Sequence, residues 1–323
     1  MLVLVTGATG LVGNNVVRLL LDRGDQVRVL ARMTSDPRPL ADLNVEIIQG
    51  DLQQQDALKQ AAEGVDLVIH AAAQISFGWT GIEQARAINV EGSRNVAKAA
   101  QANGAKMVHV SSVDTLSPGS WEQPADEETV GKKIPCTYVV SKREAEAAIR
   151  QQIDQGLNAV IVNPGFMLGP WDWKPSSGRM LIEVAKRFTP LAPSGGLSVC
   201  DVRDVANGIL AAAEKGTTGR NYILAGHNLT YFDAWNLFAK VAGGKGPAAK
   251  MGPLIRNLAG AAGDLWTKLT GREGDVNSAG IKMSSLVHYY SSARAEAELN
   301  YYCRPAEQSV EDAWKWFIEH GYV

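Results

Sequence analysis

A tyrosine and a lysine stand four residues apart in the stretch Tyr138-Val139-Val140-Ser141-Lys142, near the start of a helix expected over residues 135–156. Four-residue spacing places both side chains on one helical face, about 5–6 Å apart at Cβ. An ammonium beside a phenol favours the phenolate, so we expect the pKa of Tyr138 to fall from about 10 toward neutrality. Tyr138 could then act as a general acid and base, while Lys142 could also hydrogen-bond a cofactor ribose. The spacing occurs by chance in many helices, so the pair needs further support.

Two adjacent serines, Ser111 and Ser112, follow an apolar run that predicts a buried strand over residues 107–111. Ligands of open α/β sheets bind beyond the carboxyl ends of the strands. A serine hydroxyl there could hold a substrate carbonyl oxygen against Tyr138. Either serine could instead cap the strand end.

A glycine-rich turn joins the first expected strand, residues 2–6, to the first expected helix, residues 11–23. Gly7 allows a tight turn, Gly10 lets the backbone approach a pyrophosphate, and Gly13 lets the helix lie close to the sheet. The phosphates would then meet the unpaired N–H groups of a helix N-terminus. This arrangement is typical of a dinucleotide site, whose full motif is Thr6-Gly7-Ala8-Thr9-Gly10-Leu11-Val12-Gly13.

The tip of the second expected strand, residues 27–31, distinguishes NAD from NADP. An acid there would bind the ribose 2′-hydroxyl and repel a 2′-phosphate. This chain has Arg32 followed by Met33, Thr34 and Ser35, and a guanidinium can bind a phosphate in a bidentate manner. We therefore predict a preference for NADP, with NAD still possible; the alternative is that Arg32 is a solvated surface charge. Asp51, after the third strand, could accept a hydrogen bond from the adenine amino group or simply cap a helix.

Short continuous apolar runs alternate with helical patterns through residue 164, which predicts an α/β fold with a doubly wound parallel sheet of the Rossmann type. We expect this dinucleotide-binding domain to comprise residues 1–169 and 201–225. Residues 170–200 and 226–323 would form a smaller, mostly helical substrate-binding domain, in which residues 171–196 are irregular. The apolar helical stretch 253–270 could lie on a membrane surface, but Arg256, Asp264 and Lys268 interrupt it, which favours packing within the domain.

Together these pieces resemble the extended short-chain dehydrogenase/reductase superfamily, also described as the NAD-dependent epimerase/dehydratase family, over nearly the whole chain. Within it the chain is most similar to dihydroflavonol-reductase-like proteins, 3β-hydroxysteroid dehydrogenases and hopanoid-associated sugar epimerases. The motifs that carry the resemblance are the glycine turn, Gly50-Asp51-Leu52, His70-Ala71-Ala72-Ala73, Asn89-Val90-Glu91-Gly92, the two serines, Tyr138 to Lys142, Asn163-Pro164-Gly165, Gly169-Pro170, Val202-Arg203-Asp204-Val205, and in the tail Leu269-Thr270-Gly271-Arg272 and Trp316 to Tyr322.

The resemblance implies a role for each matching residue. The catalytic hydroxyl falls on Ser112, Tyr138 is the proton donor or acceptor, and Lys142 lowers the Tyr138 pKa and binds the ribose. Asn89 is expected to shape the wall through hydrogen bonds, a structural role more than a catalytic one. The remaining cofactor contacts are implied for Thr9, Leu11 and Val12 of the glycine turn, Leu52, Ala71, Ala72 and Ala73, and Pro164, Gly165, Phe166 and Met167.

The substrate is less clear from the sequence. Nucleotide-sugar epimerases carry an arginine before the Val202 motif, and the matching residues 195–199 hold no cation; sugar dehydratases carry Thr-Asp-Glu where this chain has Ser112-Val113-Asp114. We predict hydride transfer between NADPH and a ketone or secondary alcohol. The alternatives are a sugar or nucleotide-sugar epimerase that retains NAD(P), and a non-catalytic NADP-binding protein. Loop aromatic residues favour an apolar or ring-bearing substrate, or else they join the two domains. The candidate substrate residues are the aromatic Phe77, Trp79, Trp171, Trp173 and Tyr289, together with Gln74.

Composition excludes several other classes of function. The formal net charge of −2 over 323 residues gives no field that would attract nucleic acid. The three cysteines and five histidines are dispersed without metal-ligand spacing, so we expect free thiols and no metal site. No apolar run approaches the roughly 20 residues that span a bilayer, and the apolar N-terminus is expected to be a buried strand, so a cytoplasmic location is predicted. A small-molecule substrate is expected, and a homodimer is possible.

Overall fold

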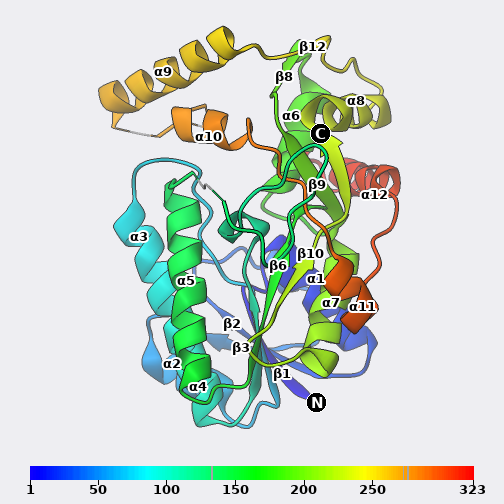
Figure 1. The fold of residues 1–323 in the computed structure, drawn as a ribbon. Helices are drawn as coiled ribbons and strands as arrows, with labels where there is room; N and C mark the ends of the chain where they lie inside the picture. The colour runs from blue at the N-terminus through cyan, green and yellow to red at the C-terminus, as the bar shows by residue number, and fades with distance from the viewer. Residues whose placement is uncertain (132–133, 272, 275) are drawn as a thin grey trace.

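A twisted parallel sheet forms the centre of the molecule, with helices on both faces (Figure 1). The computed structural model describes residues 1–131, 134–271, 273–274 and 276–323, so Arg272 of the tail motif lies outside the described residues. All six strand pairings in this sheet are parallel. Its strand order is β3 (Glu46–Gln49), β2 (Gln26–Ala31), β1 (Leu2–Thr6), β4 (Leu67–His70), β5 (Lys106–Val110), β6 (Ala159–Pro164) and β10 (Asn221–Leu224).

Two apolar layers hold the helices onto this sheet. One lies between the sheet and α1 (Leu11–Asp22), α7 (Val202–Lys215) and α11 (Ala293–Leu299). The other lies under α2 (Gln55–Ala62), α4 (Gly92–Ala102) and α5 (Thr137–Asp154). Because both faces are covered, the strands are apolar on both sides. The chain order reverses between β1 and β4, and such a switch point is where open α/β sheets bind their ligands.

The expected long helix over residues 85–103 is interrupted. It consists of α3 (Ile82–Arg86), a π-helical turn at Ala87–Glu91, and α4. A π-turn inserts one extra residue and is frequent at functional sites. Here it carries Asn89.

The prediction that residues 171–196 are irregular is wrong from residue 177 onward. The structure has α6 (Ser177–Lys186), the short β8 (Leu191–Ala192) and the start of β9 (Gly196–Asp201). The sequence Ser177-Gly178-Arg179-Met180-Leu181-Ile182 buries Leu181 and Ile182 on one face, and tertiary packing outweighs the proline- and glycine-rich flanks.

A second sheet and further helices form the smaller region above the main sheet in Figure 1. The remaining strands and α-helices are β7 (Phe166–Leu168), β11 (His227–Thr230), α8 (Tyr231–Val241), β12 (Ala249–Lys250), α9 (Pro253–Thr270), α10 (Ser278–Met283) and α12 (Ala306–Glu319). The core of the smaller region consists of the buried faces of α6, α8 and α12, packed around β9. Strand β9 pairs with β11 on one side and with β7 on the other.

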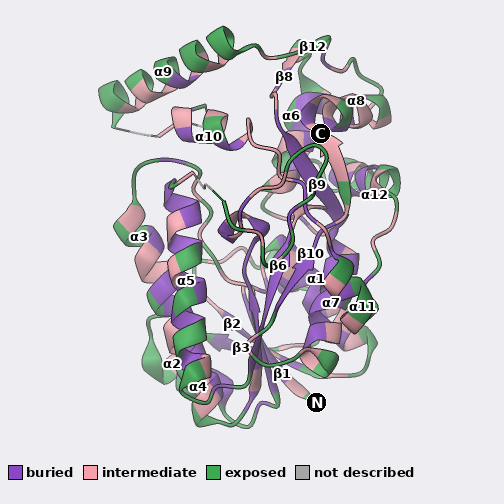
Figure 2. Ribbon diagram, in the orientation of Figure 1, coloured by how far each residue is buried: buried purple, intermediate pink, exposed green. Residues whose placement is uncertain are grey.

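The helix over residues 253–270 forms as expected, and it packs against α10 along one side only. Gly260 is the one buried residue of α9, and Figure 2 shows this helix at the top of the molecule, largely exposed. The expectation of packing within the domain is therefore wrong for most of its surface. Among the described helices, none has the length and apolar character needed to cross a membrane.

Candidate active site

Helix α5 carries a row of polar side chains on its buried face. Tyr138 is 8% exposed and Lys142 is 3% exposed, one helical turn apart. The helix begins where the loop before α3 supplies acceptors for its first free N–H groups. The N–H of Thr137 donates to the carbonyl of Gly78 at 2.8 Å, and that of Tyr138 donates to the carbonyl of Ser76 at 3.0 Å. These bonds fix the start of the helix and therefore the position of Tyr138.

Both side chains of this pair reach the carboxyl end of β5. The Lys142 Nζ donates to the carbonyl oxygen of Val110 at 2.9 Å. Ser112 lies beside the Tyr138 hydroxyl and lowers the pKa of that phenol. Since Val110 and Ser112 are two residues apart at the end of one strand, the phenol and the ammonium converge on the same edge of the sheet.

The two serines have different partners. Ser111 Oγ donates to Glu146 Oε2 at 2.9 Å and is held below the site. Ser112 lies beside Tyr138, and its Oγ accepts from the N–H of Asp114 at 3.1 Å and donates to Asp114 Oδ2 at 3.4 Å. Ser112 is thus the serine that faces the phenol, and Ser111 is part of its support.

The prediction that the pKa of Tyr138 falls is wrong: the surrounding protein raises this pKa. Burial, followed by the charge of Asp114, raises the pKa of Tyr138, and the hydrogen bond with Ser112 offsets only part of that rise. Burial also lowers the pKa of Lys142 to about 8, although Glu146 acts in the opposite direction. The spacing of Tyr138 and Lys142 reveals the neighbouring ammonium but not the desolvation of the phenol, which is the larger effect at this buried site.

Glu146 extends the row on α5 by another turn and was not anticipated. It lies four residues after Lys142, and Arg150 follows after four more. Burial opposes its ionisation, but the hydrogen bond from Asn221 and the charge of Arg150 prevail and lower the pKa of Glu146. The carboxylate accepts from five side chains, those of Ser111, Thr115, Arg150, Asn163 and Asn221. The i, i+4 repeat after Tyr138 was the sequence signal for it.

Asp114 and His288 form a second polar pair beside the serine and the phenol. His288 Nδ1 lies 3.5 Å from Asp114 Oδ1, and His288 Nε2 lies 3.1 Å from the carbonyl of Met283. Burial raises the pKa of Asp114, while the charge of His288 and the hydrogen bond from Ser112 lower it. No motif around His288 indicated that it would reach this site from the segment after α10.

The glycine turn has the geometry that close packing requires. Gly7 has φ of 76°, a left-handed conformation that favours glycine, and a Cβ there would lie 2.6 Å from the Ala72 nitrogen. A Cβ on Gly13 would collide with the carbonyl of Gly7. Gly10 begins α1 with extended backbone, and no side chain caps that N-terminus. The turn therefore presents unpaired N–H groups beside Ala71 and Ala72 at the end of β4.

The two histidines at the strand ends, His70 and His109, are buried. His70 Nδ1 lies 2.7 Å from Thr6 Oγ1 and its Nε2 lies 2.9 Å from Ser93 Oγ. Burial and the charge of Lys142 lower the pKa of His70 to about 3, so it is neutral. His109 stacks on His70 with ring centroids 5.4 Å apart. The described residues contain no group of side chains that could hold a metal ion.

Arg32 and Asp51 occupy the strand ends where they were expected. Arg32 follows the last residue of β2 and is exposed, and within the described part of the chain no side-chain partner of its guanidinium is found. Asp51 Oδ1 accepts from the N–H of Gln53 at 2.8 Å and of Gln54 at 3.2 Å. Asp51 therefore makes the hydrogen bonds of a helix cap, which was the alternative interpretation. Its hydrogen bond to the adenine amino group stays a prediction.

Asn89 uses its amide to hold the loop at the end of β4. Its Oδ1 accepts from the N–H of Gln74 at 2.7 Å, and its Nδ2 donates to the Gln74 carbonyl and to Ser141 Oγ. These contacts fit the structural role expected for Asn89. Gln74 itself keeps a buried Oε1 without a partner in the described residues. On the opposite wall, Pro164 ends β6, and Gly165 leads into β7, which begins at Phe166.

The predicted aromatic residues divide into two groups. The Phe77 ring lies 4.9 Å from the ring of Tyr138, centroid to centroid, and Trp79 follows on the same loop. Trp171 and Trp173 instead join a cluster with Trp316 and His320, and the Arg18 guanidinium lies 3.3 Å from the Trp171 centroid. The contacts of Trp171 and Trp173 fit the alternative interpretation, in which these rings join the two domains. Tyr289 packs against Trp121, with ring centroids 5.3 Å apart.

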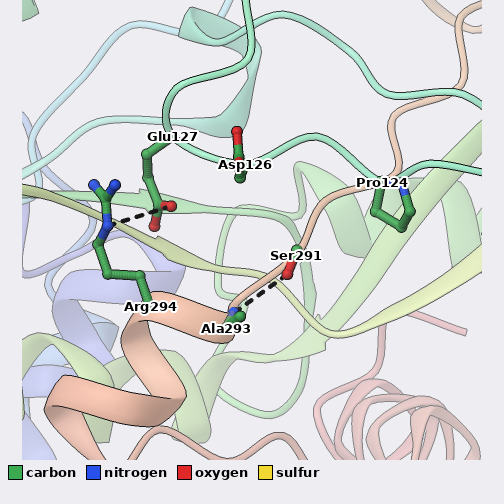
Figure 3. A pocket seen from close by; sticks show the side chains of 6 residues that line it. All are labelled: Pro124, Asp126, Glu127, Ser291, Ala293 and Arg294. Atoms are coloured by element: carbon green, nitrogen blue, oxygen red, sulfur yellow. Dashed lines mark hydrogen bonds and ion pairs between the residues drawn. The ribbon is translucent and has the colours of Figure 1, made fainter.

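A surface hollow lies between the loop that follows the 3₁₀ turn Val113–Thr115 and the start of α11 (Figure 3). Its one cation, Arg294, lies 3.6 Å from Glu127 Oε2 and also pairs with Glu128. Glu127 Oε1 in turn accepts from the N–H of Ile223 at 2.9 Å. Asp126, the other charged residue of the hollow, accepts from Thr129 Oγ1 at 2.6 Å. The hollow contains none of the predicted site residues.

Comparison with known proteins gives consistent relationships. The sequence model of the NAD dependent epimerase/dehydratase family matches residues 3–225. A "Putative dihydroflavonol 4-reductase" from Synechocystis is 34% identical, covering 99% of this chain and 95% of that protein. "Sterol demethylase protein B" from Methylococcus capsulatus is 31% identical over all of both chains. The crystal structure of gox2253 superposes with a TM-score of 0.87 at 38% identity, covering 99% of this chain and 98% of that one.

Proposed function

Because the chain belongs to the NAD-dependent epimerase/dehydratase family, and is an NAD(P)-dependent oxidoreductase of CH–OH or C=O groups, we propose that it transfers a hydride between NADPH and a ketone or secondary alcohol. The observation that carries this proposal is the convergence of Tyr138 and Lys142 on the carboxyl end of β5, with Ser112 beside the phenol. Two hydroxyls at one point can hold and protonate a single substrate oxygen.

The residues of the glycine turn fit a dinucleotide. The positive φ of Gly7 and the lack of room for a Cβ at Gly7 and Gly13 bring the α1 N-terminus close to the sheet. Its free N–H groups would hold the diphosphate, and Lys142 would hold the nicotinamide ribose. The bound nicotinamide supplies the hydride.

The raised pKa of Tyr138 keeps the phenol protonated, so that its proton is available to the substrate oxygen in the reductive direction. Ser112 would orient the substrate oxygen toward the phenol. Lys142, with its pKa lowered to about 8, is still mostly cationic at neutral pH. Its charge would stabilise the phenolate that remains after proton transfer, and exchange with solvent would then restore the phenol.

The proposed substrate is an apolar, ring-bearing carbonyl compound. Phe77 lies against Tyr138, and its ring would contact the part of the substrate beside the reacting oxygen. Two relatives carry names that refer to a dihydroflavonol and a sterol, both of them ring compounds. Purified protein with a weakly held dinucleotide and NADPH turnover on aromatic ketones supports this reductase; a tightly retained dinucleotide without such turnover would favour an epimerase.

Arg32 is proposed to bind the 2′-phosphate of NADP, which tests the cofactor preference. We expect Arg32→Glu to weaken NADPH binding by roughly 1.5–3 kcal/mol, because a charge-assisted contact is lost and a repulsive charge replaces it, with a much smaller effect on NADH. Fluorescence titration of both cofactors measures the two affinities. Arg187→Glu, at an exposed surface position, is the matched control. Equal losses for the two cofactors would overturn the assignment.

A further inference from the structure

One face of α9 is apolar, exposed and without any contact to the rest of the described chain that would bury it. We call it the outer face. Leu258 is 62% exposed, Leu265 is 57% and Leu269 is 76%. At 100° per residue these positions fall within one sector of about 160° that holds no polar side chain. The outer face consists of Leu254, Ile255, Leu258, Ala259, Ala261, Ala262, Leu265, Trp266 and Leu269.

The opposite face of α9 fixes which way the helix points. A Cβ on Gly260 would lie 3.1 Å from the Ser278 Cα, and one on Gly263 would collide with the backbone at Val276. Asp264 Oδ1 accepts from the N–H of Ser278 at 2.9 Å. Two glycines and a side-chain cap therefore seat the polar and small face of α9 closely on α10. The outer face is directed away from the protein by this packing.

The charge around α9 identifies the partner that fits. Residues 245–275 hold five basic side chains, Lys245, Lys250, Arg256, Lys268 and Arg272, and three acidic ones, Asp264, Glu273 and Asp275, whereas the whole chain has a net charge of −2. Asp264 accepts from the Ser278 amide, Glu273 accepts from Trp79 and Thr80, and the Lys282 ammonium lies over the ring of Trp79. An apolar face with Leu and Trp, flanked by Lys and Arg, is the pattern of a helix that lies in the surface of an anionic bilayer.

The same helix pair is joined to the catalytic residues. Glu273 Oε1 accepts from the N–H of Trp79 at 2.7 Å, Trp79 Nε1 donates to Ser278 Oγ at 2.8 Å, and Asn277 Nδ2 donates to the Phe77 carbonyl at 3.0 Å. The loop that receives these bonds also packs Phe77 on Tyr138 and accepts from the first N–H groups of α5. Helix α9 is thus connected, through α10 and Glu273, to the loop beside Tyr138.

We propose that the outer face of α9 seats the protein on the surface of an anionic lipid bilayer, and that the substrate is an apolar ketone or alcohol dissolved in that bilayer. The part concerning the substrate rests on the proposed function. The surface itself does not, because it follows from the exposure, packing and charge of α9. A substrate leaving the lipid beside α9 would meet the Phe77–Trp79 loop and then Tyr138.

Flotation with vesicles of phosphatidylcholine and phosphatidylglycerol tests the surface. We expect the full chain to float with these vesicles and to bind pure phosphatidylcholine vesicles more weakly, and high salt to reduce binding. Leu258→Glu combined with Leu265→Glu should weaken vesicle binding at least about tenfold, because two apolar side chains are lost from the buried layer. The urea midpoint should not change, since both positions are exposed. The matched control is Tyr302→Glu combined with Ile318→Glu, two exposed apolar side chains elsewhere on the surface.

The outcomes separate the surface from the reaction. Wild-type protein that stays out of the vesicle fraction overturns the proposal, and so does equal loss of binding in the control variant. A dimer that dissociates in the Leu258/Leu265 variant, with no vesicle binding in the wild type, would instead assign the face to a second copy. Turnover of a water-soluble aromatic ketone should be unchanged in this variant, while turnover of an apolar ketone carried in vesicles should fall. Vesicle binding without turnover of either ketone would overturn the proposed function, but it would still support the proposal that the outer face of α9 binds the bilayer.

Discussion

The two longest helices, α5 and α9, have 18 residues each and opposite relationships to their surroundings. Helix α5 turns a row of polar side chains toward the protein interior, from Tyr138 through Lys142 to Glu146. Helix α9 turns a row of apolar side chains outward, from Leu254 to Leu269. Each departs from the ordinary rule that a helix buries its apolar stripe and exposes its polar one.

The two departures have different physical supports. On α5 each buried polar group has a partner. Lys142 bonds the Val110 carbonyl, and Glu146 accepts from five donors, so the cost of desolvation is partly recovered inside the fold. On α9 no partner within the described chain recovers the cost of exposing leucines. The usual burial pattern of a helix can therefore be reversed where buried polar side chains form a reactive site, as on α5, or where exposed apolar side chains form a binding surface, as on α9.

The largest expected effect is at the first residue of the α5 row. Tyr138→Phe removes the proton donor and keeps the ring that packs on Phe77. We expect turnover to fall by about a thousandfold, because positioned general acids contribute roughly 10²–10⁴, while NADPH binding is unchanged. Steady-state kinetics and fluorescence titration measure the two quantities. Tyr302→Phe, at an exposed position, is the control, and near-normal turnover in Tyr138→Phe would remove the basis of the proposed mechanism.

Lys142→Met separates the stability of the α5 row from its chemistry. The pKa of Lys142 is about 8 in the folded protein and 10.5 ordinarily, so below pH 8 folding must bury an ammonium against its preference. We expect Lys142→Met to abolish turnover and to raise the free energy of unfolding at pH 7 by about 1–3 kcal/mol. Glu146 keeps its five donors in this variant, so no buried charge is left unpaired.

The sign of this effect has a pH dependence that urea titration can follow. As pH rises from 8 toward 10.5, the wild type increasingly folds with a neutral lysine, and its deficit relative to Lys142→Met should shrink. Lys98→Met, at an exposed position of α4, should change little at any pH. Destabilisation by Lys142→Met at pH 7 would mean that the bond to the Val110 carbonyl outweighs desolvation, and the contrast with α9 would weaken.

The smallest expected effect comes from the second polar pair. The charge of Asp114 is the second cause, after burial, that raises the pKa of Tyr138. Asp114→Asn should therefore lower that pKa. Because alcohol oxidation requires the phenolate, the acidic limb of its pH–rate profile should move to lower pH, by about one unit. Asp126→Asn, in an exposed turn, is the control. A limb that stays in place, or moves to higher pH, would show that Asp114 does not act on the phenol.

Much of the dinucleotide half could be predicted because its signals are local. The apolar runs at residues 2–6 and 67–71 are short and continuous, and they form the buried parallel strands β1 and β4. Gly7 and Gly13 are required by backbone geometry that few other residues can adopt. By contrast, α6 was missed because Pro175 and the serines beside it indicate a loop, and only contact with the rest of the small-domain core stabilises the helix.

The site was predicted as far as one helix and one strand end could specify it. The spacing of Tyr138 and Lys142 fixed that they share a face, and the position of Ser112 after a buried strand placed it at a carboxyl edge. The direction of the Tyr138 pKa shift was wrong because burial depends on the whole fold. His288 was missed because it is about 170 residues away along the chain from Asp114, and no local pattern predicts a contact at that separation.

The sequence by itself determined the alternation of strands and helices, the glycine turn and the α5 row, because each depends on residues within a few positions of one another. Only the tertiary structure decided which serine meets the phenol, how far desolvation outweighs a neighbouring charge, and that α9 turns its leucines outward. Those three depend on which surfaces the fold removes from water, and that is a property of all the packed elements together.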